Sequence, residues 1–516
     1  MSSKKTLLLP LDRAAIATIL VLVLCLGILV AQGDVVRASV RDFSWENKYV
    51  GADDISFSLI FNRPMDNQSV EKNLKIEPPL LGKFSWVGRR MVYTLEYPAP
   101  YGSKFQISLD NAQDKFAKHK SEKRTIKPFR SEFKTRDRAI AYIGVQTQKP
   151  DPEGKKLVVD NQEKGRLVVY NLTQEKKQIL TPPDLVVMDF QPYPDGSRIL
   201  FSARPSHDIN PLSAKIYSVT TGISPQPDSE PEPPGRIDLM VDSKEYQNLK
   251  FDLSPDGKTI VVQRGKANNP GDVGLWFMSA QPPNPGEKPQ LKRIETAPTG
   301  DFMITPDSSA VAVSQGEGAA IIPIQEDAKK PLDFLPQFGV VQSFAKDGSK
   351  AAMVSFNRDF TNPTQSLFLV NNQGQQKELL KIPGSIIDSQ FDPAAPVLYT
   401  LISQLVPGEQ YIEQPYLISI NLKTNKQTPL VVFPPGQRNI KMSLAPDGVG
   451  LLFDQVIPQN PNLPPSKNTP RTKEGEVIDS SSLWLMPVAP DLSSISTTEI
   501  KPQQLPFAGF YPQWLP

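Results

Sequence analysis

One short pattern recurs along this chain: an apolar strand runs into a Pro-Asp-Gly turn and comes out as another strand. The clearest copy is FDLSPDGKTIVVQRG, from Phe251 to Gly265. Related copies begin at Phe190, Met303, Ser343 and Ser443. Asp-Gly accepts the positive φ that a tight reversal needs, and the preceding proline sets φ for entry. The pattern predicts a chain built mainly from repeated antiparallel hairpins.

The spacing of these turns predicts a repeat fold. The turns centre on Asp195, Asp256, Asp307, Asp347, Asp392 and Asp447. They stand about 40–60 residues apart, which fits a four-stranded propeller blade of ~40–45 residues plus insertions. The longest insertions are rich in proline and polar residues, and the chain holds 52 prolines among 516 residues. Such segments cannot build a core, so we expect them in loops on the faces of the propeller.

The turn aspartates are interpreted as structural, because an Asp side chain in this position accepts hydrogen bonds from turn amides. A further strand follows each hairpin, as in GLWFMSA from Gly274. FDLSPDGKTIVV followed by GLWFMSA resembles the repeat of the TolB-type β-propeller. Asp307 and Asp392 lack the following glycine, so those two copies depart from the family pattern.

The ends of this region predict a closed ring. The segments RAIAYIG and GRLVVYNLTQEKKQILT supply three strands of a blade but lack its first strand. The C-terminal segment FAGFYPQWLP, Phe507 to Pro516, has the pattern of a first strand alone. Joining them completes a seventh blade and removes exposed sheet edges. We therefore predict a seven-bladed propeller over residues 137–516 that the C-terminal strand closes.

A separate body is predicted over residues 35–136. Alternating apolar residues and about seven short strands in ~100 residues suit an Ig-like β-sandwich. The stretch FSLIFNRPMDNQSVEKNLKIEPPLLGKFSW resembles the SbsA-like bacterial Ig-like domain, a cell-envelope module. The matching residues are Phe61, Arg63, Pro64, Met65, Asp66, Gly82, Phe84 and Trp86. DNAQDKF departs from the loop that is common in that family. The fold class is thus all-β, with one N-terminal transmembrane helix in addition.

That helix is predicted over residues 14–31, where eighteen residues carry no charge and would form a helix of ~27 Å. Residues 1–13 contain Lys4, Lys5 and Arg13, which would keep this tail in the cytoplasm. The protein is then a single-pass membrane protein with its bulk outside the cytoplasm. The alternative is a secreted protein, released after signal-peptide cleavage near Ala31 and Gly33.

The sequence assigns no catalytic, cofactor-binding or metal-binding residue. His119 and His207 stand in separate polar loops, and the one cysteine, Cys25, lies in the apolar N-terminal run. Histidine and cysteine are too few for the usual zinc or copper sites. With 57 basic and 55 acidic residues, the chain has no overall charge that would favour nucleic acid. Basic residues do outnumber acidic ones between Lys115 and Arg138. This basic run is interpreted either as a solvated hairpin or as a contact to anionic surfaces.

The predicted function is a membrane-anchored extracytoplasmic binding or scaffold protein, whose propeller face binds protein or polysaccharide partners of the bacterial envelope. The alternative is an envelope hydrolase or lyase that uses carboxylates at the propeller channel. Three or more acids, or a polar pocket, at the channel mouth would favour the enzyme. A channel lined by small apolar residues, together with an apolar patch on one face, would favour the binding protein.

Overall fold

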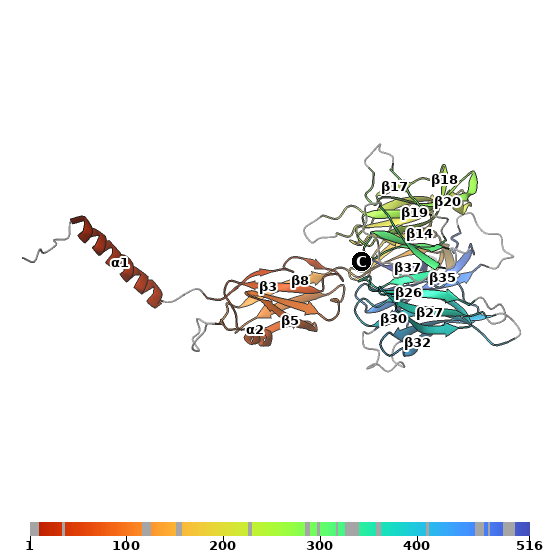
Figure 1. Ribbon diagram of the computed structural model, residues 1–516. Coiled ribbons are helices and arrows are strands. Elements are labelled where there is room, and N and C mark those ends of the chain that lie inside the picture. The colour runs from red at the N-terminus through yellow and green to blue at the C-terminus, as the bar shows by residue number, and fades with distance from the viewer. Residues whose placement is uncertain are drawn as a thin grey trace, which may run out of the picture. The chain divides into compact units, whose positions relative to one another are not determined.

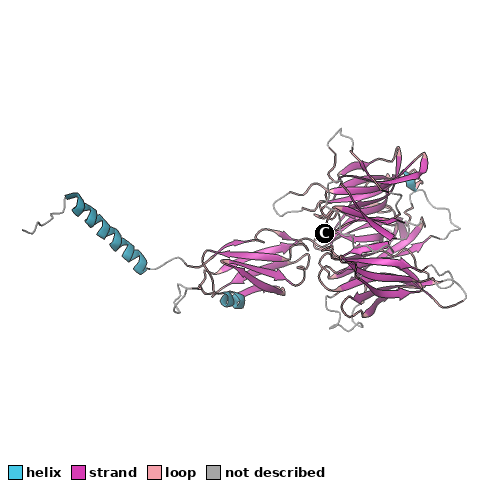
Figure 2. Cartoon of the chain, viewed as in Figure 1, coloured by secondary structure: helices cyan, strands magenta, loops and turns pink. Residues whose placement is uncertain are grey.

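The computed structural model describes most of the chain. The described residues are 10–32, 37–115, 125–150, 157–224, 230–283, 289–296, 300–315, 318–325, 340–357, 363–408, 412–459, 469–472, 475–488 and 501–516. Apart from two α-helices and one short 3₁₀ helix, the regular structure of these residues is strand (Figures 1 and 2). The centre of the basic run and His119 lie outside the described residues.

The apolar N-terminal run forms helix α1 (Pro10–Gln32). Large apolar side chains along it are exposed, among them Leu20 and Leu24. Among the residues whose side chains the structure describes, no helix combines the length and the apolar character that a bilayer crossing requires. The transmembrane helix of residues 14–31 therefore stays a prediction.

The contacts between residues divide the chain into two units. The first contains Met1–Glu46, Ser56–Thr94 and Phe105–Phe133. The second contains Asn47–Ile55, Leu95–Lys104 and Lys134–Pro516. Residues 47–55, 95–104 and 134–136 of the region 35–136 thus group with the propeller region.

The first unit contains strands of two four-stranded sheets. The first sheet has the order β1 (Val40–Phe43), β3 (Ser56–Phe61), β6 (Arg90–Leu95) and β5 (Gly82–Val87). The second has the order β2 (Tyr49–Val50), β8 (Phe129–Thr135), β7 (Lys104–Leu109) and β4 (Leu74–Glu77). Aromatic side chains of both sheets meet in one core: Phe43 lies 5.5 Å from Phe57 and 6.2 Å from Phe133, between ring centroids. This is a β-sandwich.

The motif Arg63-Pro64-Met65-Asp66 joins β3 to helix α2 (Asn67–Asn73). The carboxylate of Asp66 accepts a hydrogen bond from the Ser69 amide at 2.8 Å and so caps the helix N-terminus. Arg63 forms an ion pair with Asp114 at 2.6 Å. These contacts explain why the turn needs these residue types. Membership of the SbsA-like family stays a prediction.

In the described residues, the second unit contains a two-stranded sheet and seven larger sheets, which we call blades 1 to 7. Blade 1 has the order β13 (Lys176–Ile179), β12 (Leu167–Asn171), β9 (Ala139–Gly144), β37 (Gly509–Trp514). Blade 2 contains β14 (Leu185–Pro192), β15 (Arg198–Pro205), β16 (Lys215–Thr220) and β17 (Ile237–Val241). Blade 3 contains β18 (Tyr246–Leu253), β19 (Thr259–Lys266), β20 (Asn269–Ser279) and β21 (Lys292–Ile294). In the described residues, blade 4 contains β22 (Phe302–Ile304), β23 (Ala310–Gln315) and β24 (Gly318–Pro323).

The last three blades repeat the same antiparallel meander. Blade 5 contains β25 (Val340–Phe344), β26 (Lys350–Phe356), β27 (Gln365–Asn371) and β28 (Gln376–Ile382). Blade 6 contains β29 (Gly384–Phe391), β30 (Val397–Leu405), β31 (Glu413–Asn421) and β32 (Gln427–Val432). Blade 7 contains β33 (Met442–Leu444), β34 (Gly450–Pro458), β35 (Ile478–Pro487) and β36 (Gln503–Gln504). Outside the blades, β10 (Thr147–Pro150) pairs with β11 (Leu157–Asp160), and a 3₁₀ helix, η2, spans Pro211–Ser213.

Buried apolar clusters join each blade to the next. Such clusters contain side chains from blades 1 and 2, 2 and 3, 3 and 4, 4 and 5, 5 and 6, and 6 and 7. A further cluster joins blade 7 to blade 1, with Leu452 and Leu483 against Ile140 and Trp514. The sheets therefore form a closed ring, which is a β-propeller.

The C-terminal strand β37 lies at the inner edge of blade 1. It pairs antiparallel with β9, with Phe510 opposite Ile143 and Trp514 opposite Ile140. Strands from the two ends of the propeller region thus share one sheet, and no blade is left with an unpaired inner edge at this point.

The meander gives the propeller two faces. The turn face is the end of the propeller at which the first and second strands of blades 2 to 7 are connected. It contains the turns around Asp195, Asp256, Asp307, Asp347, Asp392 and Asp447. We call the opposite end the loop face. It contains the connections between second and third strands, such as residues 206–214, and the starts of the first strands.

Candidate ligand-binding pocket on the loop face

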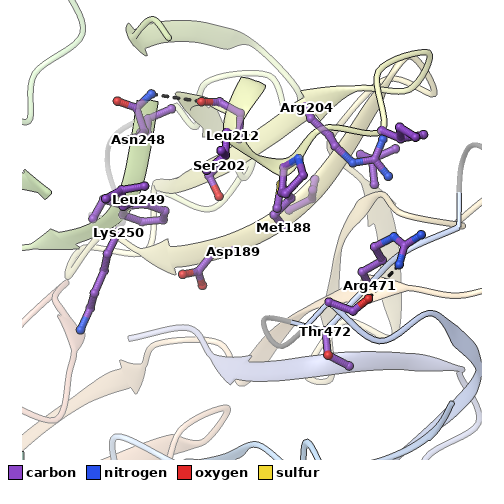
Figure 3. Close-up of a pocket in the computed structure, with 18 residues that line it drawn as sticks. Met188, Asp189, Ser202, Arg204, Leu212, Asn248, Leu249, Lys250, Arg471 and Thr472 are labelled. Carbon is purple, nitrogen blue, oxygen red and sulfur yellow. Dashed lines mark hydrogen bonds between the residues drawn. The ribbon is translucent and has the colours of Figure 1, made fainter. Parts of the chain in front are cut away.

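A pocket of about 350 Å³ opens between blades 2 and 3. Blade 2 contributes the first residues of β14, the last residues of β15 and the loop around η2. Blade 3 contributes Asn248 to Phe251 of β18, and the insertion of blade 7 contributes Arg471, Thr472 and Gly475 (Figure 3). All these segments lie at the loop end of their strands. The volume is within the range of small-molecule sites.

Two arginines stand on one side of this pocket. Arg204, in β15, is only 3% exposed, and its Nη1 donates to the carbonyls of Asp208 at 2.6 Å and Pro205 at 3.4 Å. Arg471 is exposed and donates from Nη1 to the Gly475 carbonyl at 2.8 Å. Burial lowers the pKa of Arg204, and the positive charge of Arg471 lowers it further, while Asp208 raises it. The two guanidinium groups therefore act on each other as like charges.

Three other polar side chains of the pocket are engaged by the protein. Lys250 forms an ion pair with Asp301 and donates to the Phe302 carbonyl at 2.8 Å. Asn248 donates to the carbonyls of Ala214 and Asp242, each at 3.1 Å. Asp189 accepts a hydrogen bond from the Phe190 amide at 2.9 Å. Asp189 is the one carboxylate among the residues that line this pocket.

Apolar side chains are exposed around the pocket and across the loop face. Ile209 (66% exposed), Leu212 and Leu249 line the pocket itself. Strand positions place these exposed apolar residues at the same end: Ile209, Leu212, Leu249, Phe356, Ile387, Leu405, Ile412, Val432 and Ile457. In the described blades, no large exposed apolar side chain lies at the turn face. The loop face thus carries an apolar patch, which is one of the two features that were predicted for a binding protein.

Carboxylates on the first and second strands of the blades have structural partners. Asp252 accepts a hydrogen bond from the Ile304 amide of blade 4 at 2.8 Å. Asp454 accepts from the amides of Lys441 at 2.7 Å and Tyr511 at 2.6 Å. Burial raises the pKa of Asp454 to about 7, although these hydrogen bonds and Lys441 act in the opposite direction. Burial likewise raises the pKa values of Asp252 and Asp388.

Glutamine side chains link the inner strands in the same way. Gln191 of blade 2 accepts from the Leu253 amide of blade 3 at 2.9 Å. Gln390 of blade 6 accepts from the Leu444 amide of blade 7 at 2.8 Å. Gln513 of blade 1 donates to the Phe190 carbonyl of blade 2 at 3.0 Å. The sequence analysis missed these residues, although a polar residue a few positions before several turns was the available signal.

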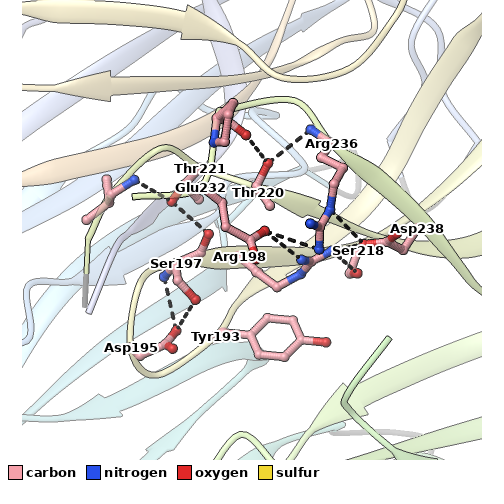
Figure 4. Close-up of polar contacts among 12 residues, drawn as sticks. Tyr193, Asp195, Ser197, Arg198, Ser218, Thr220, Thr221, Glu232, Arg236 and Asp238 are labelled. Carbon is pink, nitrogen blue, oxygen red and sulfur yellow. Dashed lines mark hydrogen bonds and ion pairs between the residues drawn. The ribbon is translucent and has the colours of Figure 1, made fainter. Parts of the chain in front are cut away.

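Most turn aspartates bond within their own turn, as the sequence predicts. Asp195 accepts hydrogen bonds from the amide and the hydroxyl of Ser197, at 3.0 and 2.8 Å (Figure 4). Asp347 bonds Ser349 in the same way, and the Ser349 amide chiefly lowers the pKa of Asp347. Beside the Asp195 turn, Arg198 pairs with Asp238 and Glu232 and so links the second and fourth strands of blade 2.

Asp447 differs from the other turn aspartates. Its side chain is 1% exposed and forms an ion pair with Arg138 at 2.7 Å. It also accepts a hydrogen bond from the Tyr101 amide at 2.8 Å. The segment Leu95–Lys104 belongs to the same unit by its contacts. The sequence alone does not distinguish Asp447 from the other turn aspartates, because its ion-pair partner Arg138 lies far away in the sequence.

The scarce histidine and cysteine residues do not converge. His207 is exposed in the loop after β15, and Cys25 is exposed on α1. A search of the described residues found no group of three or more His, Cys, Asp or Glu side chains that could hold a metal ion.

The sequence and the structure were compared with those of known proteins. No family model matches the sequence, and no curated protein matches it. Similar solved structures include TolB from Acinetobacter baumannii, with 11% identity, a TM-score of 0.37, and coverage of 86% of this chain and 83% of that one. They also include oligogalacturonate lyase from Vibrio parahaemolyticus, with 15% identity, a TM-score of 0.42, and coverage of 61% and 88%. A puromycin hydrolase gives 12% identity, a TM-score of 0.37, and coverage of 70% and 58%. These likenesses assign no function, so function has to be argued from this chain.

Proposed function

We propose that the protein is a membrane-anchored, extracytoplasmic binding or scaffold protein of the bacterial envelope, and that the loop face of its propeller binds a protein or glycan partner. The observation that carries the proposal is the gathering of exposed apolar side chains and a pocket on that one face. Soluble proteins rarely expose contiguous apolar surface without an interaction to use it. The turn face, built from the same strands, exposes none in the described blades.

The membrane anchor belongs to the same proposal. Helix α1 exposes large apolar side chains such as Val23 and Leu24, and water is a poor solvent for them. Lys4 and Lys5 precede the helix, so the positive-inside rule would keep the N-terminus in the cytoplasm.

Fractionation of host cells tests the location. We expect the full chain in the membrane pellet after an alkaline carbonate wash, and we expect protease to reach the propeller only from outside the cytoplasmic membrane. A soluble extracellular protein whose N-terminus lies near Gly33 would instead support the cleaved signal peptide. Bulk protein inside the cytoplasm would contradict both.

Site-specific photo-crosslinking tests the binding face. A photoreactive residue at Ile412 on the loop face should give adducts in native membranes, and one at Lys258 on the turn face is the matched control. Protease sensitivity or glycan digestion of the adduct then assigns the partner to protein or glycan. Adducts at Lys258 alone, or equal adducts at both positions, would contradict the proposal.

The alternative, a hydrolase or lyase that uses channel carboxylates, is the weaker proposal, because the acids described on the first strands accept hydrogen bonds from the protein. Such an enzyme needs acids that reach a substrate. Asp454 is instead fully buried and accepts hydrogen bonds from two backbone amides, and the partly exposed Asp252 accepts one from the Ile304 amide. Asp189 alone lines the pocket as a carboxylate.

A further inference from the structure

The two arginines of the loop-face pocket have hydrogen-bonding capacity that the protein does not use. Among the described residues, neither Arg204 nor Arg471 forms an ion pair with a carboxylate, and each engages backbone carbonyls through Nη1 only. A buried arginine is normally paired, because an uncompensated charge in a low-dielectric site is costly. Arg204 is nearly fully buried and has another guanidinium as its neighbour.

The acidic groups nearby do not supply the missing partner. Asp208 attracts Arg204, but no ion pair joins the two side chains, and the Asp208 carboxylate accepts a hydrogen bond from the Asn210 amide at 2.9 Å. The carboxylate of Asp189 points away from the two arginines (Figure 3). Lys250 is held by Asp301 of blade 4. The arginine side of the pocket is therefore a positive site that suits an external anion.

The rest of the pocket surface is aliphatic. Ile209, Leu212 and Leu249 expose their side chains there, whereas the one aromatic residue, Phe251, is buried. A pyranose ring is usually held by stacking on an exposed aromatic face, which the described lining does not offer. Branched aliphatic groups, in contrast, bury against Ile and Leu with a gain proportional to the apolar area removed from water.

We infer that this pocket binds an aliphatic carboxylate, with the carboxylate between Arg204 and Arg471 and the aliphatic part against Ile209, Leu212 and Leu249. A guanidinium pair suits the planar carboxylate, which accepts two parallel hydrogen bonds. The group is either a free branched-chain acid or the C-terminal leucine-like residue of a polypeptide. This inference deepens the proposed function and rests on it, because the pocket lies on the face that is proposed to bind the partner.

Titration of the full chain in detergent tests the inference. The probes are 4-methylpentanoate and acetyl-Gly-Leu, each beside its neutral amide, followed by calorimetry and saturation-transfer NMR. We expect the acids to bind and the amides to bind at least about tenfold more weakly, because a charge-assisted hydrogen-bond pair is lost. Binding of the free acid alone indicates a small-molecule site, and tighter binding of the peptide acid indicates a polypeptide C-terminus.

Variants separate the site from the fold. Arg471→Gln changes an exposed residue and should weaken acid binding about tenfold or more without a change in melting temperature. Ile209→Ser should weaken the acids and the amides alike. Lys258→Gln, on the turn face, is the matched control and should leave binding within twofold. Arg204→Lys serves as a second test of the planar fork, provided that its melting curve matches that of the unmodified chain.

Two outcomes would overturn the inference: no acid binds, or the acids bind as well to Arg471→Gln as to the unmodified chain. The proposed function fails separately. If crosslinks from Ile412 appear but no acid binds, only the inference about the pocket is lost. If the acid binds at Arg471 but the loop face gives no crosslink in membranes, only the partner-binding role is lost.

Discussion

The two faces of the propeller are made from the same strands yet differ in kind. At the turn face, blades 2 to 7 have short turns whose aspartates bond their own backbone, as at Asp195 and Asp347. At the loop face, insertions of different length bring together residues from distant blades, such as Arg204 of blade 2 and Arg471 of blade 7. Most of the exposed apolar residues of the described blades lie on this face.

The difference shows how a repeat protein separates stability from recognition. The repeated turns make each blade fold in the same way, so a change there affects the fold at one of several equivalent places. The insertions are unequal, so a side chain there has no equivalent in the other blades. Recognition is therefore expected where the repeat is broken, and the predictions below probe this comparison.

Deletion of Phe507 to Pro516 should have the largest effect. It removes β37 from blade 1 and the buried side chains of Phe510 and Trp514, so the ring loses its closure. We expect the melting temperature to fall by more than about 10 °C, since truncation of a single large buried aromatic already costs about 3–5 kcal/mol. Both faces depend on this ring. A melting curve that does not move would mean that blade 1 is complete without β37.

The second prediction concerns how the free energy of unfolding depends on pH through Asp454. Asp454 has a folded pKa of about 7, above its unfolded value, so the folded state holds its proton more tightly. Its contribution to stability is present below pH ~4 and is lost as the pH rises to 7, at most about 1.4 kcal/mol per pH unit. Denaturant unfolding at a series of pH values should show this slope, and Asp454→Asn should remove it.

The turn aspartates supply the matched control for that slope. Hydrogen bonds lower the pKa of Asp347, so its contribution is present above pH ~4 and is lost as the pH falls further. Asp347→Asn should therefore leave the slope between pH 4 and 7 unchanged. A slope that disappears in Asp347→Asn but persists in Asp454→Asn would show that we have assigned the two classes of aspartate wrongly.

A third prediction compares two aspartates at equivalent turn positions. Asp447→Ala leaves Arg138 and the Tyr101 amide without their shared partner, so the free energy of unfolding should fall by about 2–3 kcal/mol. Asp347→Ala removes hydrogen bonds within one exposed turn and should cost about 1 kcal/mol or less. Equal losses in urea titrations would contradict the special place of Asp447.

The smallest effect on stability is expected on the loop face. Ile209→Ser and Leu249→Ser replace exposed side chains, so the free energy of unfolding should change by no more than about 0.5 kcal/mol. Binding of a hydrophobic dye to the native protein should nevertheless decrease. Leu253, buried on the same strand as Leu249, is the contrast: Leu253→Ala should cost about 2–5 kcal/mol.

The repeats made much of this architecture predictable. The turn pattern around Asp256 predicts a hairpin from local chemistry alone, and the structure forms it as β18 and β19. The pocket could not be foreseen, because Arg204 and Arg471 meet only when the insertion of blade 7 reaches blade 2. The hydrogen bonds of Gln191 and Gln390 to the next blade were also missed, since they depend on how neighbouring blades are placed. The special role of Asp447 could not be predicted either, because its partners Arg138 and Tyr101 are far away in the sequence.

Hydroxyl-radical footprinting tests the unlike roles of the two faces most directly. The full chain is labelled once in native membranes and once after purification in detergent, and side-chain oxidation is read by mass spectrometry. The account predicts that Leu249, Ile412 and Ile457 on the loop face are protected in the membranes and reactive after purification, while Lys258 and Lys346 at the turn face react equally in both. Equal reactivity of the loop-face residues in both samples, or protection confined to the turn face, would contradict it.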